Sequence, residues 1–341
     1  MNTQLSIIIP CYNMERYLSV CLESLLVQNL GEDIYEVIIV NDESTDKTLK
    51  LAEQYSEQHA NIHVVDKTNA GVGAARNSGF DRSTGEYVYF LDPDDYLSAN
   101  VLGRLLNLIP RNDLDILTFK SKPVTDESHT ECMTGDTIPD SLDIFDGISY
   151  IAHHNYQNEV WWYIIKKEFM QASGVRFIEG RWMEDAIFTT ELICKAKRIA
   201  HVALDAHRYR ILPTSAMRNK TPEHYNKVIY DNEHAAHFFD GLIKKIPESH
   251  SKREDCVTRL KTRQQSFVFF LLVRLMKSDI SLKEIPKMLK GFSKKGAYPL
   301  SNFIGKDYFG TKYTFLVFVF NSKLLIRPFM QIYRTLYRVA K

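Results

Sequence analysis

The sequence predicts an α/β fold in which a mostly parallel sheet flanked by helices is followed by a mainly helical C-terminal region. Apolar runs alternate with helical patterns over the first hundred residues, which indicates a parallel sheet. Three carboxylates, Asp92, Asp94 and Asp95, directly follow one apolar run, where open α/β sheets place their ligand crevice. Beyond residue 214 the strand alternation stops and long helical patterns begin.

Strands and helices are expected in strict alternation in the first hundred residues. Four apolar, β-rich runs predict strands at 5–10, 35–40, 62–65 and 87–91. Leu and Cys recur at helical spacing from Leu18, which predicts a helix of about 15 residues. Ser44, Thr45 and Asp46 are N-cap candidates for a helix that runs to about residue 59. The Gly-rich segment 69–77 opens a further helix.

The rest of the chain divides near residue 215. Residues 120–146 are polar and turn-rich, which indicates a surface excursion rather than a linker. Regular secondary structure is expected again from 148 to 156, followed by a strand-like run at 160–164 and a helix at 166–172. Long helices are expected at 222–246 and 253–277. We therefore expect one domain over 1–215, in two parts (1–110 and 111–215), and a helical region over 216–341.

Composition excludes several classes of protein. A net charge of +1 over 341 residues gives no reason to expect nucleic acid as a partner. Five scattered cysteines without a C-x-x-C pair argue for reduced thiols and against a zinc site. No signal peptide precedes the first strand, and the longest apolar runs, 267–273 and 315–320, are shorter than the roughly 18 residues that span a membrane. A cytoplasmic protein is expected.

The carboxylates that follow the fourth strand predict a metal site. Clustered carboxylates repel one another unless a cation lies between them, and oxygen ligands favour Mg²⁺ or Mn²⁺, commonly shared with a phosphate. The alternative is an acidic turn, because Asp and Pro are both common turn residues.

Polar residues also follow the other three strands. Pro10-Cys11-Tyr12-Asn13 could seat a planar base, and Asp42 could accept from a base N–H, although helix capping is its alternative role. Gly71-x-Gly73-x-x-Arg76 follows the third strand and ends in Arg, whereas a dinucleotide fingerprint follows the first strand and ends in Gly or Ala. This disfavours a nicotinamide dehydrogenase.

In the order and spacing of these segments, the chain resembles the inverting glycosyltransferases of family 2, which have the GT-A fold. The resemblance covers residues 4 to about 218. It is carried by Ser6-Ile-Ile-Ile-Pro10-Cys-Tyr12-Asn13, Val40-Asn-Asp42-Glu-Ser44-Thr-Asp46, Asn69-Ala-Gly71-Val-Gly73-Ala-Ala-Arg76-Asn77, Tyr89-Phe-Leu-Asp92-Pro-Asp94-Asp95 and Glu184-Asp185.

The resemblance implies roles for the matching residues in donor binding. It implies a nucleotide-sugar-binding half over 1–110, in which Asp42 contacts the base and Arg76 lines the donor pocket. Asp92 would face the ribose and Asp94 would ligate Mn²⁺ or Mg²⁺, with Asp92 and His207 as further candidate metal ligands. The other expected donor contacts are Pro10, Tyr12, Asn13, Asn69 and one or both of Arg210 and Arg218, which resemble a segment that closes over the phosphates. For His207, a partly exposed strand position is the alternative.

The resemblance also implies a general base in an acceptor half over 111–215. Glu184 and Asp185 lie at the start of an expected helix, where the helix dipole favours the ionised carboxylate. We expect Asp185 to be the base and Glu184 to support it or contact the acceptor. Such first-turn acids are also common without any function. Trp161 and Trp162 are expected at the acceptor site.

The expected function is transfer of one sugar, with inversion, from a nucleotide-diphosphate sugar to a glycan hydroxyl in surface polysaccharide synthesis. Among the nucleotide-diphosphate sugars, a UDP-sugar is the expected donor. The chain lacks the Q-x-x-R-W motif and the membrane spans of processive synthases of this family. The alternatives are a non-catalytic nucleotide-sugar-binding protein and a sugar nucleotidyltransferase. The sugar, the linkage and the oligomeric state are not predicted.

A basic C-terminal segment, 323–341, predicts an amphipathic helix from Pro328 onward. One side would carry Phe329, Tyr333, Leu336 and Ala340, and the other Arg334, Arg338 and Lys341. Such a helix could lie on an anionic membrane surface and bring the active site to a lipid-linked acceptor. The alternative is a terminal helix that packs on its own domain.

Overall fold

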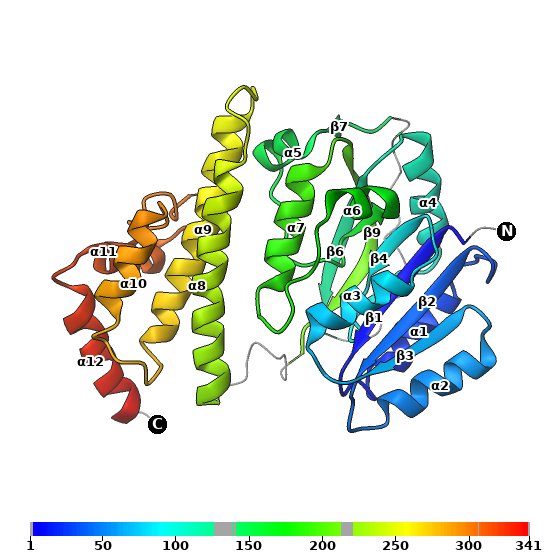
Figure 1. Ribbon diagram of the computed structural model, residues 1–341, viewed down its shortest axis with the longest axis horizontal. Helices are drawn as coiled ribbons and strands as arrows, with labels where there is room; N and C mark the ends of the chain where they lie inside the picture. The colour runs from blue at the N-terminus through cyan, green and yellow to red at the C-terminus, as the bar shows by residue number, and fades with distance from the viewer. Residues whose placement is uncertain (1–2, 126–138, 140, 213–220, 306, 340–341) are drawn as a thin grey trace. The chain divides into compact units, whose positions relative to one another are not determined.

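The structure is a computed structural model, and it describes residues 3–125, 139, 141–212, 221–305 and 307–339. The chain forms two compact units (Figure 1). Unit 1 comprises Met1–Tyr150 and Asn155–Pro213, and unit 2 comprises Ile151–His154 and Thr214–Lys341. This division lies next to the boundary that the sequence predicts near residue 215.

Unit 1 is built on one nine-stranded sheet with the order β3-β2-β1-β4-β8-β6-β9-β5, in which β7 also pairs with β9. The strands are β1 (Leu5–Cys11), β2 (Tyr35–Asp42), β3 (Ile62–Lys67), β4 (Tyr87–Phe90), β5 (Tyr96–Leu97), β6 (Ile116–Val124), β7 (Ile144–Phe145), β8 (Tyr163–Lys166) and β9 (Ile199–Arg210).

Strands β1 to β4 pair in parallel, which confirms the α/β fold predicted for the first hundred residues. The expectation of a mostly parallel sheet holds only for this half. Strand β8 is antiparallel to both β4 and β6, and β9 is antiparallel to β5 and β7. The register of β6 against β9 also shifts between Thr118 and Ser121. The sheet as a whole is therefore mixed.

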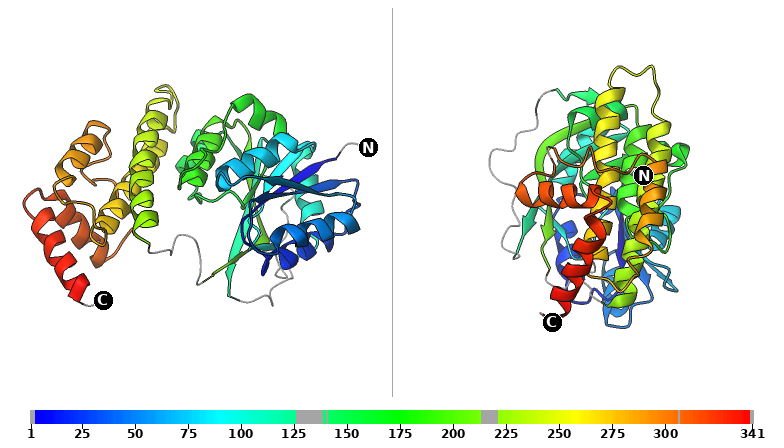
Figure 2. Two further views of the ribbon diagram at one scale, coloured as in Figure 1. Left: turned by 60° about the horizontal axis from the view of Figure 1, so that its bottom comes forward. Right: turned by 90° about the vertical axis from the view of Figure 1, so that its left-hand side faces the viewer.

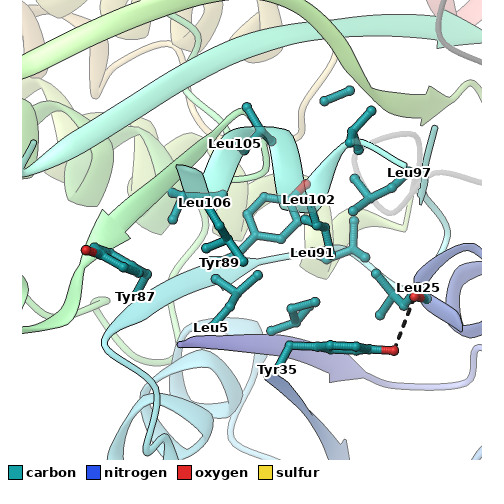
Figure 3. Packing of buried hydrophobic residues seen from close by; sticks show 14 of the residues in the cluster. Leu5, Leu25, Tyr35, Tyr87, Tyr89, Leu91, Leu97, Leu102, Leu105 and Leu106 are labelled. Carbon is teal, nitrogen blue, oxygen red and sulfur yellow. Dashed lines mark hydrogen bonds between the residues drawn. The ribbon is translucent and has the colours of Figure 1, made fainter. Parts of the chain in front are cut away.

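Helices cover both faces of the sheet. On one face, α1 (Leu18–Leu26), α2 (Thr48–Gln58) and α4 (Leu102–Arg111) share one apolar cluster with alternate residues of β1 and β2. Figure 3 shows part of this cluster, including residues of α1 and α4. There the Tyr35 hydroxyl donates to the Leu25 carbonyl at 3.2 Å. On the other face lie α3 (Val72–Arg82) and α7 (Glu184–Lys195) (Figure 1). Gly79 of α3 lies so close to Ile8 and Val40 that a Cβ would come within 2.4 Å of Ile8. The other helices in this part of the chain are α5 (Gly147–His153), which the division into units cuts after Tyr150, and α6 (Lys167–Ser173).

Two local predictions differ from the structure. Helix α1 has 9 residues rather than about 15, and it ends before Asn29, which has a positive φ of 51°. Helix α2 begins at Thr48 after Lys47, so none of the three predicted residues is the N-cap residue itself. Asp46 nevertheless accepts from the Thr48 amide at 2.9 Å, which satisfies one free N–H of the first turn.

Unit 2 is helical, as predicted, and begins with a pair of 23-residue helices, α8 (Pro222–Lys244) and α9 (Arg253–Leu275). They are followed by α10 (Ile285–Lys294), α11 (Thr311–Asn321) and α12 (Ile326–Val339). In the part of the chain that the structure describes, no helix is both long and apolar enough to span a membrane.

Helix α12 packs against its own unit, which corrects the predicted division of its faces. Its buried residues are Ile326 and Met330, and the Arg334 guanidinium reaches inward to the Leu275 carbonyl at 2.5 Å. Arg334 therefore does not lie on an outward cationic face. Ala340, Lys341 and the Arg338 side chain lie outside the described residues.

Candidate active site

The loops after β1 and β2 are tied together by Asn13. Its side-chain carbonyl oxygen accepts from the backbone N–H of Thr45 at 2.8 Å, and its backbone N–H donates to Ser44 Oγ at 3.0 Å. Asn13 and Glu43 both have positive φ, 56° and 62°, which is sparsely populated for residues other than Gly and is found at ligand sites. The Tyr12 ring is 48% exposed beside these loops, so it is free to stack on a planar group.

Asp42 organises the segment after β3. Its carboxylate accepts from Lys67 Nζ at 2.8 Å and from the amides of Ala70 and Gly71 at 3.0 and 2.9 Å. The Asn69 side-chain amide donates to the Asp42 carbonyl at 2.8 Å. Asp42 therefore does not cap the helix after its own strand, and its buried carboxylate holds the turn that begins α3. Pro10 is buried within β1, one residue before the loop that carries Tyr12.

Arg76 joins two parts of the predicted site. This buried guanidinium on α3 donates to Asp92 Oδ1 at 2.8 Å and to Glu184 Oε1 at 3.0 Å. Residues that are 108 positions apart in the sequence are thus brought to one ion-pair cluster. Arg76 therefore contacts Asp92 of the predicted D-x-D pair and Glu184, the neighbour of the predicted base, and its guanidinium is buried.

Asp94 is the carboxylate most suited to a bound cation. Among the described residues it makes no ion pair, whereas Asp92 is paired with Arg76. Burial, and then the charges of Asp95 and Asp92, raise the pKa of Asp94 to about 7. No cluster of three or more His, Cys, Asp or Glu in the described part of the chain could hold a metal alone. One carboxylate completed by substrate phosphates is a usual Mg²⁺ arrangement, so Asp94 fits a shared site.

Asp95 and His207 form a buried pair beside Asp94. Asp95 Oδ1 accepts from the Arg210 amide at 2.8 Å, and Asp95 Oδ2 lies 3.3 Å from His207 Nε2. His207 Nδ1 lies 2.8 Å from Ser121 Oγ. Burial lowers the pKa of His207 to about 3, so the ring is neutral at neutral pH. His207 is fully buried rather than partly exposed, and its Nε2 makes no hydrogen bond to any residue that the structure describes although Asp95 Oδ2 lies close to it, so its role as a metal ligand stays a prediction.

Trp161 and Trp162 pack inside unit 1. The Trp161 ring stacks on His207 with centroids 4.4 Å apart and planes at 6°. Its other stacking partner is Tyr209, which is 39% exposed. Trp162 Nε1 donates to the Glu159 carbonyl at 2.8 Å. Both tryptophans are almost fully buried, so they shape the site from behind rather than present a broad face to a ligand.

The predicted base lies at the first turn of α7. Met183, immediately before it, has a positive φ of 67°. Glu184 is buried against Arg76, and Asp185 is partly buried with Oδ1 accepting from the Ala186 amide at 2.6 Å. Burial, and then the charges of Glu184 and Glu159, raise the pKa of Asp185 well above its ordinary value. This direction is opposite to the effect of the helix dipole expected from the sequence, because burial and the neighbouring carboxylates outweigh it.

Arg210 is the basic residue at the end of β9, and its guanidinium lies over the rings of Tyr17 and Tyr96, 5.1 and 5.6 Å from their centroids. Arg218 lies outside the described residues. Sequence reasoning missed Glu159 and Ser121. Glu159 could have been found from the sequence, because it is an acidic residue directly before the run that contains both tryptophans. Ser121 lies in a polar strand that has no distinguishing pattern.

Comparison with known proteins gives one family. Residues 6–139 match the model of glycosyl transferase family 2. The chain is 28% identical over 315 residues to the uncharacterized glycosyltransferase YibD of Escherichia coli, covering 82% of this chain and 89% of that protein. It is 32% identical over 212 residues to the poly(ribitol-phosphate) beta-glucosyltransferase of Bacillus spizizenii, covering 61% of this chain and only 32% of that protein.

A solved structure matches the whole fold. Residues 1–349 of Staphylococcus aureus TarS, crystallised with UDP-GlcNAc, superpose with a TM-score of 0.69 at 20% identity, covering 99% of this chain and 93% of that one. At this identity the match establishes the fold, and it extends over both units of the chain.

Proposed function

The chain belongs to glycosyltransferase family 2, and we propose that it transfers one sugar, with inversion, from a nucleotide-diphosphate sugar to a hydroxyl of a glycan acceptor. The observation that carries the proposal is the Asp92–Arg76–Glu184 cluster, because it holds donor-side and base-side carboxylates in one rigid arrangement. Named relatives that act on poly(ribitol phosphate) support an acceptor of the surface-polymer class.

The donor in this proposal is a UDP-sugar. The exposed ring of Tyr12 would stack on the base beside the loop that Asn13 fixes, and Asp42 with Asn69 would hold the turn that frames it. Asp92 would accept from the ribose through the edge that Arg76 leaves free. The UDP-GlcNAc complex of the structurally similar TarS supports this choice of donor.

A divalent cation, Mn²⁺ or Mg²⁺, is part of the proposal. Asp94 would hold it together with the donor diphosphate, and the cation would offset the charge on the departing diphosphate. Arg210, and Arg218 from the undescribed segment, are the proposed additional phosphate contacts.

Asp185 is the proposed general base. In an inverting transfer the acceptor oxygen attacks the anomeric carbon, the bond to the diphosphate breaks, and the hydroxyl proton moves to Asp185. Glu184 stays paired with Arg76 and keeps a negative charge beside Asp185, which helps to hold the pKa of Asp185 high enough for this role.

We also propose that the acceptor is a lipid-linked glycan, so that the enzyme works at the cytoplasmic surface of a membrane. Free thiols at Cys11 and Cys21 suit a reducing compartment. The basic C-terminal segment supports attraction to anionic lipids.

A thermal-shift panel of nucleotide sugars with and without Mn²⁺ tests the donor assignment, because a ligand that binds only the folded state raises the melting temperature of the protein. A UDP-sugar should give the largest Mn²⁺-dependent shift, and Asp94→Asn should reduce it. If no nucleotide sugar shifts the melting temperature, the proposed function is wrong.

Release of UDP in the presence of a glycan acceptor separates transfer from binding alone. A non-catalytic sugar-nucleotide-binding protein would show the thermal shift without acceptor-dependent UDP release. A sugar nucleotidyltransferase would instead release pyrophosphate. The loop after β1 carries Glu15, whose carboxylate accepts from the Lys47 amide, rather than the basic phosphate loop that such an enzyme needs.

A further inference from the structure

The end of unit 2 exposes most of the large apolar side chains on the described surface. Of the fourteen exposed large hydrophobic residues, nine lie between residues 304 and 339. They are Ile304, Phe309, Phe315, Phe318, Leu324, Leu325, Ile332, Leu336 and Val339. Such a concentration marks an interaction surface, because soluble monomers rarely expose large apolar patches without a use for them.

These side chains belong to a packed structure rather than to a loose tail. Arg334 fixes α12 to the end of α9 through the Leu275 carbonyl, and Lys277 lies 5.9 Å from the Tyr337 ring centroid. Phe315 on α11 makes an edge-to-face contact with Phe329 on α12, with centroids 5.9 Å apart. Both helices lie on the side of unit 2 that faces the viewer in the right-hand view of Figure 2. The outer faces of α11 and α12 therefore adjoin.

The outer face of α12 differs from the one that the sequence predicts. Ile332, Leu336 and Val339 are 61%, 64% and 82% exposed, and their spacing places them on one side of the helix. On α11, Phe315 and Phe318 are three residues apart and 55% and 64% exposed. Leu324, between the helices, is 86% exposed.

The charged residues of the two helices and the turn between them have one sign. Residues 308–341 contain six basic residues, Lys312, Lys323, Arg327, Arg334, Arg338 and Lys341, and no Asp or Glu, although Asp307 directly precedes them. Lys312, Lys323 and Arg327 are exposed among the apolar residues of the two helices and the turn between them. Long cationic side chains beside exposed Phe, Leu and Ile are typical of surfaces that lie in an anionic lipid interface.

We propose that the surface formed by α11, residues 322–325 and the outer face of α12, here named the α11–α12 surface, binds an anionic lipid bilayer. This deepens the proposed function, since it names the surface that would bring the enzyme to a lipid-linked acceptor. A second copy of the chain fits less well. In a two-fold interface the same acid-free, cationic patch would face itself, and charged residues are depleted from the cores of such interfaces.

Vesicle binding by the full-length protein tests the proposal. The wild-type chain should sediment with vesicles of phosphatidylcholine containing phosphatidylglycerol and bind pure phosphatidylcholine vesicles much more weakly. Substituting Lys312, Lys323 and Arg327 by Gln should weaken binding to the anionic vesicles more than tenfold, since each cation near such a surface contributes about fivefold. The matched control replaces three exposed lysines elsewhere, Lys50→Gln, Lys197→Gln and Lys245→Gln, and should bind as wild type.

A second variant tests the apolar part of the surface. Phe318→Ser, Ile332→Ser and Leu336→Ser together should also reduce vesicle binding more than tenfold, with an unchanged melting temperature because these side chains are exposed. The control Val27→Ser with Tyr230→Ser removes exposed apolar groups elsewhere and should not change binding.

Three results would overturn the proposal. The first is that the wild-type protein binds neutral and anionic vesicles equally well, and the second is that both surface variants bind anionic vesicles as strongly as the wild type. The third is that the wild type is a dimer and the apolar variant is a monomer that still binds vesicles. UDP release with a water-soluble acceptor should be the same in all variants. If vesicle binding behaves as expected but no variant releases UDP, the proposed function fails while the α11–α12 surface stands.

Discussion

Arg76 pairs with Asp92 from the loop after β4 and with Glu184 from α7; the side chains of Arg76 and Glu184 are buried, and that of Asp92 is partly exposed. A single guanidinium therefore offsets two carboxylates that would otherwise repel each other in a poorly solvated place. The planar guanidinium donates hydrogen bonds to both carboxylates at once from two different nitrogens. The single ammonium nitrogen of a lysine does not offer this arrangement of donors.

Replacement of Arg76 by Gln should lower the free energy of unfolding by about 3 kcal/mol, since the buried carboxylate of Glu184 and the partly buried carboxylate of Asp92 lose their partner. Urea unfolding followed by circular dichroism measures this. The control is Arg176→Gln, which breaks the exposed pair with Asp81 and should cost at most about 1 kcal/mol. Equal losses in both variants would contradict the role given to Arg76.

Asp185→Asn should lower kcat by at least about 10²-fold and leave the affinity for UDP unchanged, because a general base acts on the acceptor proton and not on the donor. Steady-state kinetics and UDP titration calorimetry measure the two quantities. Glu191→Gln, which changes a carboxylate on the same helix outside the cluster, should leave both unchanged. Full activity of Asp185→Asn would exclude it as the base.

Mn²⁺-dependent UDP binding should weaken as the pH falls through about 7. The pKa of Asp94 is raised to about 7, so below that pH a proton competes with the cation for the carboxylate. Calorimetric titration with UDP and Mn²⁺ at several pH values measures the effect. In Asp94→Asn the remaining binding should lose this pH dependence, and an unaltered profile would count against Asp94 as the metal ligand.

At the scale of the element, buried hydrogen bonds fix strands β1 and β2 to the turn before β4. The carboxylate of Glu36 on β2 accepts from Ser6 Oγ at 2.5 Å and from the amides of Thr84 and Gly85 at 2.6 and 3.3 Å. Burial alone would raise the pKa of Glu36, but these hydrogen bonds outweigh it and lower the pKa below its ordinary value. The ionised form of Glu36 therefore stabilises this part of the sheet.

Glu36→Gln should lower the free energy of unfolding by about 1 kcal/mol at neutral pH, because the four hydrogen bonds all go to Oε1 and the neutral carbonyl oxygen of Gln accepts them less strongly than a carboxylate does. Since the pKa is lower in the folded state, the contribution of Glu36 is present above its unfolded pKa of about 4.3 and is lost as the pH falls through the folded value. Urea midpoints of wild type and variant should thus converge at acidic pH. The exposed Glu53→Gln should show no such difference at any pH.

The sequence predicted elements well where their pattern is local. The run 35–40 is apolar except for Glu36 because β2 is buried on both faces, so the strand was evident. Strands β6 and β9 were not predicted, because polar residues such as Lys120, Ser121 and His207 interrupt them, and Ser121 and His207 are hydrogen-bonded to each other only across the sheet. Helix α11 appeared only as a short apolar run, since its outer residues are Phe rather than polar.

The sequence indicated which residues belong to the site, but not which of them contact one another. Strand-end motifs indicated Asp42, Arg76, Asp92 and Asp94, yet no local pattern links Arg76 to Glu184, which the packing of α3 against α7 alone brings together. The outward face of α12 was assigned wrongly for the same reason. Periodicity separates the sides of a helix, but the inward hydrogen bond of Arg334 decides which side is covered.

At the scale of the whole molecule, donor binding should protect unit 1 and leave unit 2 unchanged. Every donor residue that the structure describes belongs to unit 1, and a ligand at 100 times its Kd stabilises the state it binds by about 2.7 kcal/mol. Hydrogen exchange with UDP and Mn²⁺ should therefore slow in 69–77, 91–95 and 183–187 but not in α9. Slowed exchange throughout α9 would contradict a donor site confined to unit 1.

The shared guanidinium also constrains how the sequence can change over time. Loss of Arg76, Asp92 or Glu184 alone leaves charges in the cluster without their partner, so the effects of single substitutions cannot simply add. A lineage that alters one of these positions would need compensating changes at the other two. Among related chains the three positions should therefore covary as a unit, although 16 residues separate the first two and 108 separate the first from the third.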